Sequence, residues 1–304
     1  MVWKAWKAAC ASPRLAMVLV PGSRRYLLKL VGLSGPCKSS VTLTVKGTLV
    51  SDKDRRHWIV FQSIHKLTVN GGGVVDGYDE TWWKHPCKIT WKKAMLARLS
   101  ITASGTSPNT DGIHITRSKD VQVTNCKIKT GDDCMSIENG THNLHATASA
   151  SEAWEMTTRD SRAEVSGITI DSVQLYGTTN GARIKTYQGG SGYAKDITFQ
   201  NMIMYDVKNP IIIDQDYCDK AKPCKAQGSA VEVSNVVFKN IRGTTVTKDA
   251  IKLNCSKNVP CHGITLQNID LKMQGGNGAA QSTCANAKWR KSGTVLPQPC
   301  SSKN

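Results

Sequence analysis

The sequence predicts an all-β fold, a right-handed parallel β-helix with a short N-terminal helical cap. Strand-like segments of eight residues recur along the chain, and most of their starting points lie 27–39 residues apart. Repeats of this length are typical of solenoids and propellers. The segments contain short β runs without helical periodicity, and their fifth position is repeatedly Asn. These observations favour a parallel β-helix, in which each coil pairs with its neighbours about 4.8 Å away.

The repeated segments share apolar residues at the first and third positions and an apolar residue or Cys at the sixth. One gap of 47 residues leaves room for a degenerate coil near Leu144. We expect the Asn side chains at the fifth position to form a hydrogen-bonded ladder along one corner, rather than to bind a ligand. The segments begin at Leu67, Ala94, Val121, Ile168, Ile197, Val236 and Ile264, and the ladder residues are Asn125, Asn201, Asn240 and Asn268.

The composition shows no shift that would mark a domain boundary, so we expect one domain over residues 1–304. In this interpretation residues 1–40 form an N-terminal cap, residues 41–275 form the coils, and residues 276–304 form a C-terminal tail held by a disulfide. The cap begins with a short helix predicted at Val2–Ala11, which would cover strand edges that otherwise invite aggregation. The residues expected near one face of this helix are Trp3, Trp6 and Ala9.

The cysteine pattern predicts disulfides and an oxidising compartment. The chain has 11 cysteines but no Cys-x-x-Cys pair, which argues against a zinc ribbon or a thioredoxin-type motif. Residues 1–7 do not resemble a signal peptide, and the apolar run Leu15–Val20 is too short to span a membrane. The close cysteine pairs that could form disulfides are Cys10 with Cys37, Cys218 with Cys224, Cys255 with Cys261, and Cys284 with Cys300.

The charge balance predicts a polyanionic partner. Forty basic residues stand against 23 acidic ones, a formal net charge of +17. A field of this sign attracts nucleic acid, anionic membranes or acidic polysaccharides, and an ordinary basic surface without a special partner stays a further alternative. No nucleic-acid motif is present and the aromatic residues do not interleave with the basic ones, so we expect neither a nucleic-acid nor a membrane partner.

Three carboxylates are the main candidates for chemistry. Asp111 lies 21 and 22 residues before Asp132 and Asp133, about one coil, which would place their backbones roughly 5 Å apart. Glycoside hydrolysis needs one carboxylic acid to protonate the leaving oxygen and another carboxylate to activate water or attack the sugar. Taken singly, the residues also fit a turn at Asp111-Gly112, and a calcium-binding loop or a solvated corner at Asp132-Asp133.

Two cations follow about two coils later. Arg183 and Lys185 share one face of an expected strand, while Ile184 points the other way. Such cations could hold the carboxylate of an acidic sugar, and Arg183 offers bidentate geometry. The alternative is an exposed face of a strand.

These motifs together resemble those of polygalacturonases, the pectinases of glycoside hydrolase family 28, and in particular the plant members. The resemblance covers nearly the whole chain and includes three of the four signature motifs of the family. They are Asn109-Thr110-Asp111-Gly112, Gly131-Asp132-Asp133-Cys134 and Arg183-Ile184-Lys185; Trp3–Cys10 and Asn209–Cys218 resemble further plant-type segments.

The resemblance implies inverting hydrolysis of α-1,4-linked galacturonic acid in pectin by a monomer secreted to the cell wall, without metal or cofactor. Asp132 would be the general acid, and Asp111 and Asp133 would hold and activate the water. The residues implied in substrate binding are Arg183, Lys185, Asn109 and Tyr217.

The fourth motif of the family, Gly-His-Gly, is missing. Its expected place between Asp133 and Arg183 holds Thr147–Arg159, which lacks alternation and looks more helical than its neighbours. Glu152–Arg159 back-translates to a string that resembles the end of the missing motif in a shifted reading frame, which indicates a local deletion with a change of frame. The family also implies roughly two coils that are missing after Cys87. We therefore predict weak or absent activity, and the alternative is an inactive pectin-binding β-helix.

Overall fold

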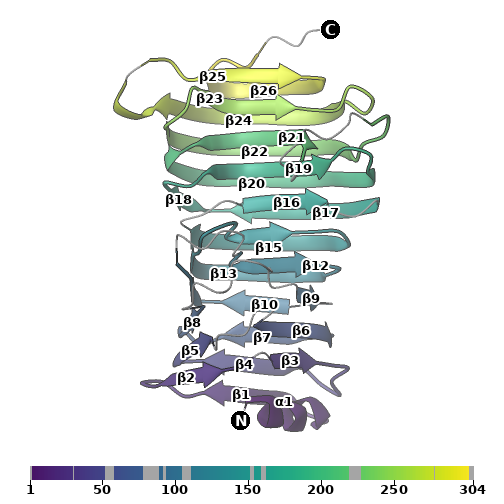
Figure 1. Ribbon diagram of the computed structural model, residues 1–304, viewed down its shortest axis with the longest axis vertical. Coiled ribbons are helices and arrows are strands. Elements are labelled where there is room, and N and C mark those ends of the chain that lie inside the picture. Colours follow the sequence, from purple (N-terminus) through teal and green to yellow (C-terminus); the bar gives the residue numbers. More distant parts are fainter. Residues whose placement is uncertain are drawn as a thin grey trace. The chain divides into compact units, whose positions relative to one another are not determined.

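The computed structural model describes residues 2–29, 31–51, 58–77, 89–91, 94–104, 111–150, 154–158, 162–218, 227–276 and 278–300 (Figure 1). The chain divides into two compact units, which are described separately. The N-terminal unit comprises Met1–Ser136 and His142–Ala150, and the C-terminal unit comprises Ile137–Thr141 and Ser151–Asn304. The single domain expected over residues 1–304 stays a prediction.

The N-terminal unit begins with helix α1 (Val2–Ala11) and continues as stacked parallel strands. A first sheet has the order β1 (Ala16–Val20), β4 (Val41–Val45), β7 (Leu67–Asn70), β10 (Ala94–Ala97), β13 (Lys119–Lys129) and β15 (Thr141–Ala150). A second has the order β3 (Val31–Ser34), β6 (Ile59–Ile64), β9 (Ile89–Trp91) and β12 (Ile113–Thr116). Strands β2 (Arg25–Leu28), β5 (Thr48–Ser51), β8 (Val74–Asp76) and β11 (Ser100–Thr102) pair in the same way, and β14 (Met135–Ile137) follows β13.

The C-terminal unit repeats this arrangement (Figure 1). One sheet contains β17 (Arg162–Asp171), β20 (Ser191–Val207), β22 (Glu232–Thr245), β24 (Cys261–Met273) and β26 (Ala287–Leu296), and β18 (Gln174–Tyr176) pairs with β20. The other contains β16 (Trp154–Thr158), β19 (Asn180–Tyr187), β21 (Asn209–Tyr217), β23 (Asp249–Asn254) and β25 (Gln281–Ala285). The described pairings are parallel, so the predicted parallel β-helix is confirmed.

The apolar positions of the repeated segments form the core because the strands pair in register. Ile168 pairs with Ile197, Ile197 pairs with Val236, and all three side chains are fully buried. At the third position Phe199 and Phe238 stack inside the coil with ring centroids 5.4 Å apart. The degenerate coil expected near Leu144 is also present, because Leu144 of β15 pairs with Val121 of β13.

The predicted asparagine ladder is confirmed for Asn201, Asn240 and Asn268. The four Asn residues at the fifth position have φ values between 51° and 54°, the left-handed region that Asn tolerates better than most residues. In the C-terminal unit, Asn240 Nδ2 donates to Asn201 Oδ1 (2.9 Å), and Asn268 Nδ2 donates to Asn240 Oδ1 (3.2 Å). The ladder therefore follows from a bend that every coil makes at the same place.

The predicted cap is confirmed in part. Trp6 and Ala9 of α1 are buried, and Trp6 packs edge-to-face against Phe61. Trp3 was expected on the same face, but its side chain is 47% exposed and lies under the Lys7 ammonium, so that prediction is wrong. The buried face of this 10-residue helix is narrow. It includes Trp6 and Ala9 but not Trp3, although the three residues are evenly spaced.

Three of the expected disulfides are present, namely Cys10–Cys37, Cys255–Cys261 and Cys284–Cys300. Cys218 is also disulfide-bonded. Cys224 and Cys87 lie outside the described residues, and Cys126 and Cys134 are buried thiols. Strand pairing extends beyond the expected range 41–275, because β1 pairs with β4 and β25 pairs with β23. Within the described residues, no helix has the length and apolar character needed to cross a membrane.

Candidate active site

Asp111, Asp132 and Asp133 form one cluster in the N-terminal unit. Asp111 lies two residues before β12, and the other two lie between β13 and β14 on the next coil. The coils are joined at this point by backbone hydrogen bonds from Gly112 N to Asp133 O (2.9 Å) and from Ile113 N to Cys134 O (3.0 Å). The three carboxylates each offer an oxygen, and these atoms lie within 4.8 Å of one another. The predicted juxtaposition of Asp111 with Asp132 and Asp133 is confirmed.

The environment differs between the three carboxyl groups. Asp133 is buried, with 5% of its surface exposed, whereas Asp111 and Asp132 are half-buried. The two half-buried carboxyl groups can therefore be reached by a bound substrate, whereas Asp133 is largely covered by the fold.

Gly112 allows the close approach of the two coils. A Cβ atom at this position would lie 2.3 Å from Ile128 Cγ2 and 2.7 Å from the Cys134 carbonyl oxygen, so a side chain cannot be accommodated without a shift of the backbone. A glycine is therefore required at position 112, where the segment that contains Asp111 packs against the turn that contains Asp132 and Asp133.

His114 is part of this cluster. It lies on β12 as expected for a strand residue, but it is 1% exposed and its Nδ1 lies 3.3 Å from Asp111 Oδ2. The sequence interpretation did not include this contact. The signal available was the spacing, because a histidine three residues after Asp111 can turn back toward it where the chain enters the strand.

The three carboxylates could also hold a cation. Calcium takes six to eight oxygen ligands, and carboxylates are among those it prefers. The described part of the chain offers Asp111, Asp132 and Asp133 as such a group. This is the calcium-binding alternative that the sequence left open for Asp132 and Asp133.

Arg183, Lys185 and Tyr217 form a second cluster, within the C-terminal unit. Ile184 is fully buried in the core, whereas Arg183 Cζ lies 5.1 Å and Lys185 Nζ 4.4 Å from the centroid of the Tyr217 ring. Contact with one ring confirms that the two cations share a face of β19. The remaining predicted substrate residue, Asn109, lies outside the described residues.

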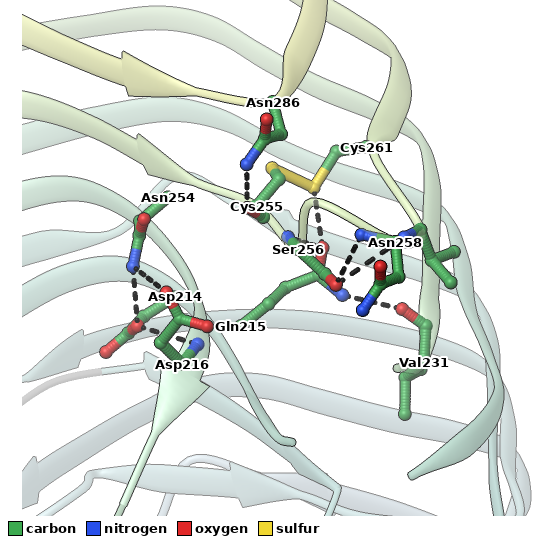
Figure 2. The surroundings of a disulfide bond; sticks show 11 residues. Asp214, Gln215, Asp216, Val231, Asn254, Cys255, Ser256, Asn258, Cys261 and Asn286 are labelled. Atoms are coloured by element: carbon green, nitrogen blue, oxygen red, sulfur yellow. Dashed lines mark hydrogen bonds between the residues drawn. A yellow bond between two sulfur atoms is a disulfide. The ribbon is translucent and has the colours of Figure 1, made fainter. Parts of the chain in front are cut away.

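The strand that ends in Tyr217 is anchored by a buried amide (Figure 2). Gln215 is fully buried, and its Nε2 donates to the Val231 carbonyl oxygen (2.6 Å). Its Oε1 accepts from the backbone N–H of Ser256 (3.1 Å), in the loop closed by the Cys255–Cys261 disulfide. The amide therefore joins β21 to two segments that are distant in the sequence.

Neighbouring polar groups continue this network on the exposed side of the strand (Figure 2). Asn254 Nδ2 donates to Asp216 Oδ2 (3.1 Å) and Asp214 Oδ1 (3.4 Å). Gln188 Nε2 donates to Asp216 Oδ1 (3.2 Å). The hydrogen bonds on both sides of β21 hold the backbone from which Tyr217 contacts the two cations.

The sequence matches the family model described as glycosyl hydrolases family 28 over residues 10–99 and 91–295. Polygalacturonase QRT2 of Arabidopsis thaliana is 39% identical over 346 aligned residues, covering 97% of this chain and 79% of the relative. The polygalacturonase of Persea americana is 41% identical, covering 93% of this chain and 72% of the relative.

The chain belongs to glycosyl hydrolase family 28.

Solved structures agree on the fold of this family 28 chain. The endo-xylogalacturonan hydrolase of Aspergillus tubingensis superposes with a TM-score of 0.68 at 17% identity, covering 95% of this chain and 93% of that chain. The polygalacturonase of Erwinia carotovora ssp. carotovora gives 0.63 at 18% identity, covering 88% and 87%. The first plant alignment has 346 positions, more than the 304 residues of this chain, so it includes positions at which this family 28 member has no residue.

The segment in which the sequence analysis expects the Gly-His-Gly motif forms strands in its described residues. Residues 147–150 end β15, and Trp154–Thr158 form β16. The expectation that Thr147–Arg159 is more helical is therefore wrong for these residues. Strand β16 pairs in parallel with β19, with Glu155 opposite Arg183 and Thr157 opposite Lys185. Pairing with β19 determines the local structure here although the segment lacks the alternation that marks the other strands.

Two histidines precede this segment. His142 and His145 lie on β15, opposite Lys119 and Gln122 of β13, and His145 is exposed. Both therefore belong to the preceding strand.

Proposed function

We propose that this family 28 chain acts on pectin and hydrolyses α-1,4-galacturonosyl linkages with inversion, at a rate impaired by the missing Gly-His-Gly motif. The observation that supports it most is the acidic cluster, in which Asp111, Asp132 and Asp133 bring carboxylate oxygens within 4.8 Å of one another. General acid and base work in glycoside hydrolysis needs such carboxyl groups.

The proposed roles follow the family's motifs. Asp132 protonates the glycosidic oxygen, and its partial exposure is compatible with contact to a substrate. Asp111 and Asp133 hold and activate the water that attacks the sugar. The spacing in the cluster is shorter than the roughly 6.5–9.5 Å common between the carboxyl groups of inverting enzymes. Inversion is therefore proposed from the family resemblance, and proton NMR of the first product anomer tests it.

Arg183 and Lys185 are proposed to bind the carboxylates of galacturonate units, with Tyr217 and Asn109 as further binding residues. The shared contact of both cations with Tyr217 supports a common role. An arginine can bind a carboxylate with two parallel hydrogen bonds. No metal or cofactor enters the proposed reaction.

The impairment rests on the sequence of β16, which contains no histidine. General acid–base groups contribute about 10²–10⁴ to a rate, so losing a histidine that tunes the acid pair leaves a slow enzyme. The second candidate is an inactive, pectin-binding β-helix, which the two cations on β19 support because they can bind substrate without catalysis.

We also propose secretion to the cell wall as a monomer, with neither nucleic acid nor membrane as a partner. Disulfides such as Cys10–Cys37 and Cys255–Cys261 support an oxidising compartment. The net charge of +17 supports binding to an acidic polysaccharide.

The test measures reducing ends released from polygalacturonate, alongside a polygalacturonase that has all four motifs. We expect release that is slow in the wild-type chain and lost in Asp132→Asn. Release as fast as in the four-motif enzyme would refute the impairment. Retention on a polygalacturonate column without any release would favour the inactive binding protein, and neither release nor retention would refute both.

A further inference from the structure

We infer that the C-terminal unit has a second binding site for an acidic polysaccharide, on the sheet that contains β20, β22, β24 and β26. The site is a groove of about 540 Å³ that crosses these strands. Its lining includes Asn201, Asn240, Asn268, Arg242, Asp270 and Lys272. These residues belong to a different sheet from β19, which carries the proposed substrate cations.

The asparagine ladder gives the groove repeated hydrogen-bonding groups. Each side-chain amide has two N–H donors and an oxygen with two lone pairs. Asn240 uses one donor toward Asn201 and one lone pair toward Asn268, so one of each remains on this exposed residue. A sugar hydroxyl both donates and accepts a hydrogen bond, and it matches such a pair. The three ladder residues lie on successive coils, about 4.8 Å apart.

Charged groups beside the ladder favour an acidic sugar. The exposed guanidinium of Arg242 makes no hydrogen bond or ion pair with the part of the chain that the structure describes. Lys272 Nζ lies 3.1 Å from Asp270 Oδ2, an exposed pair that water screens. Arg242 can bind a uronate carboxylate with two hydrogen bonds.

Two tyrosines extend the groove along the strand direction. Tyr176 and Tyr205 stack with centroids 4.5 Å apart and planes 4° apart, although they are 50% and 41% exposed. Tyr205 lies two residues after the groove residue Ile203 on β20, on the same face of the strand. The Tyr176 hydroxyl donates a hydrogen bond to Gln174 Oε1 (2.6 Å). Large exposed aromatic surfaces that are already ordered are suited to binding the apolar face of a sugar ring.

The ligand class rests on the proposed function. The net charge of +17 and Arg242 favour a polyanion, and the ladder amides and the tyrosine pair favour a saccharide among polyanions. The ligand we infer is the de-esterified galacturonate polymer itself. Such a site would keep the protein on its polymeric substrate.

Affinity electrophoresis in gels that contain de-esterified polygalacturonate tests the inference. The groove variants are Arg242→Gln and the double variant Tyr176→Ala/Tyr205→Ala. The double variant Tyr176→Phe/Tyr205→Phe preserves the stacked rings. Lys288→Gln removes an exposed charge on β26 outside the groove and serves as the matched control. Lys185→Gln removes a cation of the proposed substrate site, and circular dichroism verifies that every variant folds.

We expect Arg242→Gln and the alanine pair each to weaken binding about tenfold, while the phenylalanine pair and Lys288→Gln bind like the wild type. Lys185→Gln should keep measurable binding to the polymer. Adding the groove substitutions to Lys185→Gln should remove this remaining binding. Groove variants that bind like the wild type would overturn the inference and leave the proposed hydrolysis intact. A wild-type chain that does not bind would overturn the inference, and the release of reducing ends would then decide the proposed hydrolysis separately. Equal binding of single-stranded DNA, weakened by the same substitutions, would overturn the choice of a saccharide.

Discussion

Replacing Gln215 with Ala tests what holds the strand that carries Tyr217. The amide is fully buried and makes two hydrogen bonds to backbone groups, the Val231 carbonyl and the Ser256 N–H. Ala removes both partners but leaves the disulfide Cys255–Cys261 in place. The change therefore isolates the contribution of the side chain from that of the covalent link.

The expected loss follows from the number of groups left without a partner. A buried polar group that loses its hydrogen bond costs about 1–3 kcal/mol, so two such groups cost about 2–6 kcal/mol. One kcal/mol shifts the melting temperature by about 2–4 °C in units of 150–250 residues. We therefore expect the unfolding transition to fall by roughly 4–24 °C.

Thermal unfolding without reductant, followed by circular dichroism, measures this shift. Gln281→Ala is the matched control, because Gln281 is exposed and its Nε2 donates to Asp249 Oδ1 (2.7 Å) at the surface. A surface substitution of this kind should stay within about 0.5 kcal/mol. At temperatures below both transitions, Gln215→Ala should also weaken retention on polygalacturonate, because Tyr217 is displaced. If Gln215→Ala and Gln281→Ala have the same melting temperature, the buried amide does not anchor β21.

Four further outcomes follow from the same geometry. Asp132→Asn should lower any residual release of reducing ends by a factor of at least about 10² with an unchanged circular dichroism spectrum; equal release would remove Asp132 as the acid. EDTA should leave binding and release unchanged, and a loss that calcium restores would favour the cation alternative at Asp111, Asp132 and Asp133. Lys185→Gln should weaken binding to polygalacturonate about tenfold, with the exposed Lys257→Gln as control, and equal effects would indicate non-specific charge attraction. Burial raises the pKa of the Cys126 thiol, so iodoacetamide at pH 8 should alkylate it only after unfolding; mass spectrometry that finds rapid labelling of the folded protein would contradict this burial.

The coils could be predicted because each has the same local cause. The chain bends at the fifth position, where the backbone adopts the left-handed conformation. Asn125, Asn201 and Asn240 all have this conformation. Apolar residues on either side of the bend then point into the core and stack with their equivalents, as Phe199 does with Phe238. Local conformation and repeat spacing therefore carry enough information to predict the register of the strands.

Features that depend on non-local contacts could not be predicted in this way. Strand β16 forms where the sequence shows no alternation, because its backbone groups pair with β19. The contact between His114 and Asp111 depends on how the chain enters β12, which the motif does not specify. The exposure of Trp3 depends on how α1 meets the first coil, although the helix itself follows from its sequence.

Strand β16 also explains why the proposed impairment is compatible with the fold of this family 28 chain. A coil of a solenoid is stabilised by backbone pairing with its neighbours, and this pairing accepts almost any residues that tolerate an extended conformation. The register between β16 and β19 satisfies it with Glu155 and Thr157 opposite the two cations. General acid–base catalysis, in contrast, needs a particular group at a particular place. Substitution of one coil can therefore preserve the strand that carries Arg183 and Lys185 while it removes a histidine, and binding of polygalacturonate should persist where hydrolysis fails.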